Sequence, residues 1–158
     1  MRLSPEALAE IRDVVAELRR APVPLFLLDP ADFRLDACRA TMAEVCERAQ
    51  KGPMFAVLDR LPLEEMSRDE AVAVYWLISS LLARPVAQKL NGQMFYDVMD
   101  TGAKLKPGSG IRPTVTNVDL RFHNDNSYNE TPPDYVCLFC LHPAKQGGVS
   151  QVVSVATV

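Results

Sequence analysis

The sequence lacks an excess of positive charge, and it lacks a long apolar segment. Its 17 Lys and Arg residues are outnumbered by 20 Asp and Glu residues, which gives a net charge of −3 with both histidines neutral. Nucleic-acid-binding proteins usually carry a basic excess, so this balance argues against that class. No apolar stretch reaches the roughly 18 residues that a membrane-spanning helix needs. We therefore expect neither nucleic acid nor a membrane as a partner.

The first residues also lack the apolar region of a secretory signal, because charged and apolar residues are interspersed in MRLSPEALAEIRD. We therefore expect a cytoplasmic protein whose cysteines are reduced. Apolar residues make up 48% of the chain and charged residues 23%, which is ordinary for a globular protein and excludes a disordered one. A chain of 158 residues is long enough to bury a core.

Zinc-binding motifs are incomplete as well. Cys137 and Cys140 form the single C-x-x-C, with no second C-x-x-C and no spaced histidine pair to complete a tetrahedral zinc site. Residues 135–141 have the apolar pattern of a buried strand, in which residues three apart face opposite sides. We therefore interpret both cysteines as small apolar core residues.

Local capping signals predict three helices. Ser4 followed by Pro5 begins a helix over residues 5–20. A second helix is expected over residues 36–50. Ser67 and Glu70 have the spacing of a capping box, which begins a third, strongly apolar helix that ends near residue 83.

The second part of the chain has the pattern of strands. Alternating or short apolar runs predict strands at residues 54–61, 94–99, 115–125, 135–141 and 149–154. Helices at the front and strands at the back predict the α+β class. Residues 102–110 contain three glycines, which fits either a mobile lid or an ordinary exposed loop.

The expected strands near the end of the chain have apolar faces that need more partners than the chain supplies. We therefore expect the native protein to continue beyond residue 158. Exposed apolar sheet surface also predicts self-association, or pairing with a second chain.

The tetrapeptide Phe122-His123-Asn124-Asp125 contains the strongest chemical signal. On a strand, residues two apart share a face, with Cα atoms about 6.5–7 Å apart. An imidazole and a carboxylate so placed supply two of the three ligands of the 2-His-1-carboxylate site of non-haem Fe(II) enzymes. The pattern His-x-Asp is common by itself, and a surface histidine paired with an aspartate is the alternative.

Further motifs surround this pair with a recognisable order and spacing. They comprise Thr116-Asn117, LRFHNDNSY at residues 120–128, TPPDYV at 131–136, LFCL at 138–141, Pro143-Ala144 and GGVS at 147–150. Together they resemble the taurine dioxygenase-like family of Fe(II)- and 2-oxoglutarate-dependent oxygenases. The resemblance implies a double-stranded β-helix, or jelly roll, flanked by helices. Residues 51–158 would form the N-terminal part of this domain, with the C-terminal part absent, and residues 1–50 a helical extension.

The resemblance assigns His123 and Asp125 as the first two iron ligands and implies no further catalytic residue. Ser150 would donate a hydrogen bond to the distal carboxylate of 2-oxoglutarate. The family's distal histidine ligand and its arginine for the same carboxylate have no counterpart in this sequence, and His142 is interpreted as a surface residue. Because Asp125 is retained, hydroxylation or desaturation is favoured over halogenation.

Four polar residues near the pair are candidates for substrate binding. Asn117 and Asp119 precede His123 by even numbers, so strict alternation puts them on the same face. Asn126 and Tyr128 lie just beyond the pair. The alternative for each is a hydrogen bond within the loop. If Asp119 faces the site, it would suit a cationic substrate group.

The predicted activity is oxidation of an unactivated C–H bond of a small organic molecule, using Fe(II), 2-oxoglutarate and O2 and releasing succinate and CO2. The 158-residue chain alone is expected to be inactive, because two ligands bind iron weakly. One alternative is a catalytically inactive jelly-roll module that acts in binding or pairs with another chain. Another is a cupin-like metal protein that does not use 2-oxoglutarate.

Overall fold

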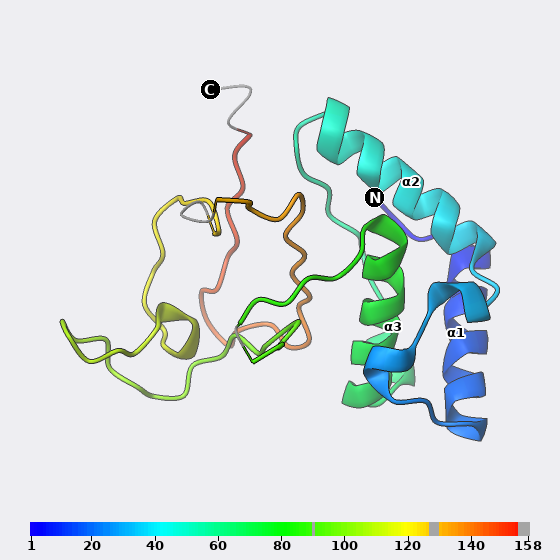
Figure 1. The fold of residues 1–158 in the computed structure, drawn as a ribbon, viewed down its shortest axis with the longest axis horizontal. Coiled ribbons are helices and arrows are strands. Elements are labelled where there is room, and N and C mark those ends of the chain that lie inside the picture. The colour runs from blue at the N-terminus through cyan, green and yellow to red at the C-terminus, as the bar shows by residue number, and fades with distance from the viewer. Residues whose placement is uncertain (90, 127–129, 155–158) are drawn as a thin grey trace. The chain divides into compact units, whose positions relative to one another are not determined.

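The computed structural model describes residues 1–89, 91–126 and 130–154 (Figure 1). They divide into two compact units. The first contains Met1–Arg84 together with the segment that begins at Cys137. The second is Pro85–Val136.

Helix α1 (Pro5–Arg20) opens the first unit as its capping signals predict. The Ser4 hydroxyl accepts a hydrogen bond from the backbone N–H of Ala7 at 3.1 Å, which satisfies one of the free donors at the helix start. Apolar residues at helical spacing place Ile11 and Val14 in the core, where they are almost fully buried.

Helix α2 (Asp36–Lys51) begins without a side-chain cap of its own, because Leu35 occupies the N-cap position. Glu10 of α1 takes this role instead. Its two carboxylate oxygens accept the backbone N–H groups of Ala37 and Cys38, each at 2.9 Å. The start of α2 is therefore fixed to the middle of α1.

Helix α3 (Arg68–Leu82) has both halves of the predicted capping box. Ser67 accepts from the backbone N–H of Glu70, and the Glu70 carboxylate accepts from the backbone N–H of Ser67. The helix packs against α1 and α2. Its Tyr75 side chain contacts the segment after residue 136.

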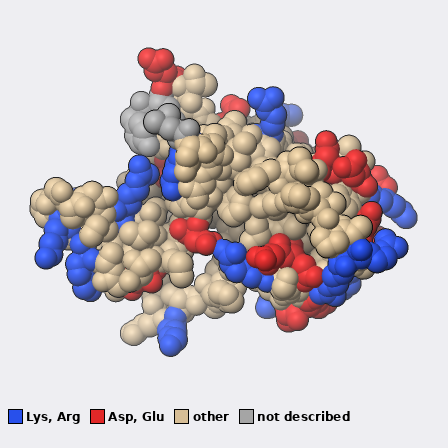
Figure 2. Space-filling view, turned by 60° about the horizontal axis from the view of Figure 1, so that its bottom comes forward, with Lys and Arg blue, Asp and Glu red and all other residues tan. Residues whose placement is uncertain are grey.

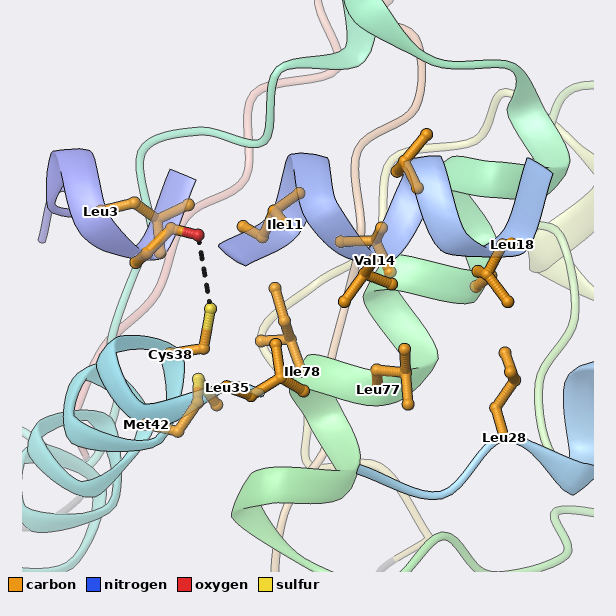
Figure 3. Close-up of a cluster of buried hydrophobic side chains, with 14 of the residues drawn as sticks. Leu3, Ile11, Val14, Leu18, Leu28, Leu35, Cys38, Met42, Leu77 and Ile78 are labelled. Carbon is orange, nitrogen blue, oxygen red and sulfur yellow. Dashed lines mark hydrogen bonds between the residues drawn. The ribbon is translucent and has the colours of Figure 1, made fainter. Parts of the chain in front are cut away.

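The core of the first unit lies between these three helices (Figure 3). Ile11, Leu77, Val74 and Cys38 are its largest fully buried side chains. The Cys38 thiol donates a hydrogen bond to the carbonyl of Ala7 at 3.5 Å, drawn as the dashed line in Figure 3. Burial, followed by the nearby Glu10 carboxylate, raises the pKa of this thiol to about 12.

Short 3-10 turns complete the first unit. They are η1 (Leu25–Leu27), η2 (Pro30–Asp32) and η3 (Leu63–Glu65). The indole N–H of Trp76 donates to the carbonyl of Leu28 at 3.2 Å, and the Trp76 ring contacts Phe26 edge-to-face at 5.4 Å between centroids. These contacts join the connection between α1 and α2 to helix α3.

The strand predictions are wrong. No β-strand forms in any of the five predicted segments, which are residues 54–61, 94–99, 115–125, 135–141 and 149–154. The 3-10 turn η4 (Pro113–Val115) overlaps the first residue of the segment 115–125. In the part of the chain that the structure describes, the single β-bridge joins Arg2 and Asp59.

The predicted jelly roll is therefore not found in the described residues, which form helices and irregular segments instead of an α+β fold. A strand needs a neighbouring strand to accept and donate its backbone hydrogen bonds. Here the extended segments bond to turns or to a helix, as where Met99 N–H donates to the carbonyl of Thr114 at 3.0 Å. Alternating apolar residues predict an extended backbone but do not provide its partner.

The predicted burial of residues 135–141 is also wrong in part. Cys137 and Cys140 are exposed, and Leu138 is 81% exposed. One side of this segment is nevertheless covered. The Tyr75 ring of α3 stacks on Phe139 with centroids 5.0 Å apart, and the Tyr75 hydroxyl donates to the carbonyl of Cys137 at 2.9 Å.

Ion pairs join α1 to the start of α3. The Arg12 guanidinium contacts both carboxylate oxygens of Glu65 at 2.7 and 2.8 Å. Arg19 contacts both oxygens of Glu70 at 2.7 and 3.0 Å. Acidic and basic side chains lie close together at the right of Figure 2. Among the described residues no helix is long and apolar enough to span a bilayer.

Candidate metal centre

His123 and Asp125 lie in the second unit, where an extended segment turns. The turn begins at Asp125, and Asn126 follows with φ of 53°. This left-handed conformation is one that asparagine adopts more readily than most residues.

The two side chains lie close together. His123 Nε2 lies 3.4 Å from Asp125 Oδ1. The other ring nitrogen, Nδ1, lies 2.7 Å from the main-chain carbonyl oxygen of Arg121. Both side chains remain accessible, with 52% and 51% of their surface exposed. The predicted proximity of His123 and Asp125 is therefore found, although the two residues do not lie on a strand.

The separation suits a shared metal ion better than a strong ion pair. Charge-assisted N–H···O bonds are about 2.7–2.9 Å long, so 3.4 Å is long for one. Two donors that each lie about 2.1 Å from one metal are about 3.0 Å apart at a right angle and about 3.4 Å apart at the tetrahedral angle. The imidazole and the carboxylate thus fit two neighbouring positions on one ion.

The rest of a metal centre is not found nearby. Among residues 1–89, 91–126 and 130–154, no group of three His, Cys, Asp or Glu side chains could hold a metal ion. Metal binding by His123 and Asp125 stays a prediction.

Three of the four predicted substrate-binding residues lie among the described residues of the same unit. Asn117 and Asp119 are exposed on the irregular segment before His123. Asn126 is half-buried at the turn. Tyr128 lies outside the described residues. Their roles in substrate binding stay predictions.

Ser150 belongs to the first unit and is exposed. It follows a turn in which Gly147 and Gly148 have φ of 71° and 68°. A Cβ atom on Gly148 would lie only 2.7 Å from the Cβ atom of Ala144, so this position requires glycine on two grounds. His142 is exposed, as expected for a surface histidine.

The glycine-containing segment at residues 102–110 is an exposed loop closed by hydrogen bonds at its base. Thr101 donates both its backbone N–H and its hydroxyl to the carbonyl of Val115, at 3.1 and 2.9 Å. Within the loop, Ser109 donates to the carbonyl of Lys106. These bonds are those of an ordinary ordered loop, and movement as a lid stays a prediction.

Comparison with known proteins decides the family. Residues 24–158 match the family described as taurine catabolism dioxygenase TauD, TfdA family. The chain belongs to the TauD/TfdA family. The resemblance seen in the sequence motifs is thereby confirmed, and the match begins within the segment 1–50 that was expected to be an extension.

A curated relative supports the same assignment. The chain is 27% identical over 146 residues to FR-33289 synthase of Streptomyces rubellomurinus (strain ATCC 31215). The aligned region covers 92% of this chain and 41% of the relative. The chain thus spans less than half the length of that relative.

Members of the TauD/TfdA family are non-haem oxygenases that generally use Fe(II), 2-oxoglutarate and O2. One contact of the candidate centre escaped sequence reasoning, namely that between His123 and Arg121. The acceptor is a main-chain carbonyl, which every residue carries, so no residue type could have indicated it.

Proposed function

We propose that this chain supplies part of the active site of an Fe(II)- and 2-oxoglutarate-dependent dioxygenase. The reaction is hydroxylation or desaturation at an unactivated C–H bond of a small organic molecule, with succinate and CO2 as co-products. The observation that carries the proposal is the 3.4 Å approach of His123 Nε2 to Asp125 Oδ1 in a chain of the TauD/TfdA family.

His123 and Asp125 bind the iron in this proposal. When bound, Fe(II) together with 2-oxoglutarate and O2 supplies the oxidising power for the attack on the C–H bond. The imidazole donates a neutral nitrogen and the carboxylate a negative oxygen, a mixed set that suits iron better than the thiolates of a structural zinc site. The exposure of both side chains leaves room for the remaining ligands.

The other predicted residues bind organic groups. The Ser150 hydroxyl donates a hydrogen bond to the distal carboxylate of 2-oxoglutarate, and the preceding glycine turn presents it to solvent. Asn117, Asp119, Asn126 and Tyr128 contact the substrate. An Asp119→Ala variant with an unchanged KM would remove Asp119 from this set.

The 158-residue chain by itself is proposed to bind Fe(II) weakly and to leave 2-oxoglutarate intact, because two protein ligands do not make a facial triad. Self-association or pairing with a second chain is proposed from the exposed apolar side chains. Leu138 and Val149 are each 81% exposed. Light scattering across a dilution series measures this directly, and a monomer at every concentration would refute it.

Anaerobic Fe(II) titration of the chain tests the metal site. His123→Ala and Asp125→Ala should each weaken binding strongly, whereas His142→Ala, which removes the other exposed histidine, should leave it unchanged. Equal affinity in all four proteins would refute the proposed site. Turnover is then tested with a protein that contains this chain and has the full length of the curated relative. The measurement is succinate formation, which should require both Fe(II) and 2-oxoglutarate.

A further inference from the structure

The hydrogen-bond partner of the His123 ring restricts its tautomer. A carbonyl oxygen only accepts hydrogen bonds, so the 2.7 Å contact between His123 Nδ1 and the Arg121 oxygen requires a proton on Nδ1. In a neutral imidazole the other nitrogen, Nε2, then carries the free electron pair. Nε2 is the atom that faces Asp125.

We propose that the main-chain carbonyl of Arg121 is a positioning group for the metal centre, because it selects the Nδ1–H tautomer of His123 and thereby presents Nε2 as the metal-binding atom. The inference rests on the proposed function in that it assigns the metal to this pair. Histidine ligands in metalloproteins almost always donate their second ring N–H to a carbonyl or a carboxylate, which fixes the ring and makes the ligating nitrogen more basic.

The positioning contact is local, because its two partners are separated by only one residue. It therefore needs no packing from distant parts of the chain, which matters at a site where both ligands are half exposed. An exposed imidazole without such a bond is divided among tautomers and ring orientations, and its apparent metal affinity falls by the fraction that is competent to bind. The Arg121 carbonyl removes part of this loss before metal arrives.

The contact uses the main chain of Arg121, so the guanidinium is dispensable for it. The effect of the Arg121 carbonyl can therefore be separated by experiment from any electrostatic effect of the Arg121 guanidinium. Arg121→Ala should keep the tautomer of His123. A main-chain ester in place of the amide between residues 121 and 122, introduced with phenyllactic acid at Phe122, should weaken the carbonyl as an acceptor and shift the tautomer.

The metal-free 158-residue chain tests the tautomer directly. Long-range 1H–15N correlation spectra of the chain labelled at histidine, in mildly alkaline buffer, distinguish the two ring nitrogens. His142→Gln assigns the signals and His142 serves as the exposed reference. We expect His123 to favour Nδ1–H more strongly than His142 does. A His123 population that matches His142, or that favours Nε2–H, would overturn the inference.

The second arm uses Zn(II) alone as the probe. Zn(II) should move the Nε2 signal of His123 and not its Nδ1 signal, and the ester at residue 122 should reduce Zn(II) affinity several-fold. A matched ester at Leu120, which alters the carbonyl of Asp119, should leave both tautomer and affinity unchanged. Equal effects of the two esters would overturn the positioning role.

Failure of this inference is distinguishable from failure of the proposed function. Zn(II) bound through Nδ1 would refute the selection of Nε2 while leaving a metal site at His123. A dominant Nδ1–H tautomer with no Zn(II) binding would refute the metal site and leave the carbonyl as the group that fixes the ring.

Discussion

Glu10 on α1 caps helix α2 through the backbone N–H of Cys38, which its carboxylate accepts at 2.9 Å. The second carboxylate oxygen accepts from the neighbouring residue of α2 at the same distance. The side chain is only 9% exposed. One carboxylate thus satisfies two backbone donors that the sequence around Leu35 leaves without a cap.

Removing this cap should destabilise the first unit. Glu10→Ala should lower the free energy of unfolding by about 1–2 kcal/mol, as for other helix N-caps. Burial raises the pKa of Glu10, but the backbone hydrogen bonds outweigh it and leave that pKa below its usual 4.5. Urea unfolding, followed by the fluorescence of the single tryptophan, Trp76, measures the change.

The sign of the pH dependence follows from that lowered pKa. The contribution of Glu10 is present above about pH 4.5 and is lost as the pH falls through the lower folded-state value. Glu10→Gln should therefore flatten the loss of stability on acidification relative to the unsubstituted chain. Parallel curves for the two proteins below about pH 4.5 would contradict the cap.

Glu70 should contribute at still lower pH. Its hydrogen bond with Arg19, followed by that with the Ser67 backbone, lowers the Glu70 pKa to about 2. Stability from this carboxylate is present above about pH 4.5 and disappears as the pH falls toward 2. Glu70→Gln should make unfolding less sensitive to pH in this interval. Glu64→Gln provides an acidic control on the same surface.

Tyr75 should hold residues 137–141 against α3 by two separable contacts. Tyr75→Phe removes the hydrogen bond to the Cys137 carbonyl but keeps the stacking on Phe139, whereas Tyr75→Ala removes both. Amide hydrogen exchange of residues 138–141 should accelerate modestly in the first variant and strongly in the second. Equal exchange in all three proteins would show that the segment is held by other groups.

The turn before Ser150 should depend on Gly148 more than on Gly147. Both have left-handed φ, but only at Gly148 does an added Cβ meet the Cβ atom of Ala144. Gly148→Ala should open the turn to trypsin at Lys145, and Gly147→Ala should do so less. The double substitution of Gly148→Ala with Ala144→Gly should restore part of the resistance.

The helices were predictable because their signals are local. Ser4 and the Ser67–Glu70 capping box lie next to the backbone groups that they satisfy. The cap of α2 was not predictable, because Glu10 is 27 residues from Ala37 in the sequence. The strands failed for the same reason, since residues 54–61 or 149–154 specify an extended backbone and not the partner that would make a sheet.

The residues of the candidate site could be predicted from the sequence, but their arrangement could be predicted less well. The spacing of His123 and Asp125 indicated that they lie together, and they do, but on an irregular segment and not on a strand. A pattern of residue types reports which side chains have suitable chemistry. It does not report main-chain acceptors such as the Arg121 carbonyl, which become visible only once the backbone path is known.

The buried thiol of Cys38 has a practical consequence. With its pKa near 12 and its side chain enclosed between α1 and α2, it is almost entirely un-ionised at neutral pH and shielded from alkylating reagents. Cys140, by contrast, is exposed. Once Cys46 and Cys137 are replaced, a fluorophore or spin label can be attached at Cys140 while the buried Cys38 is kept.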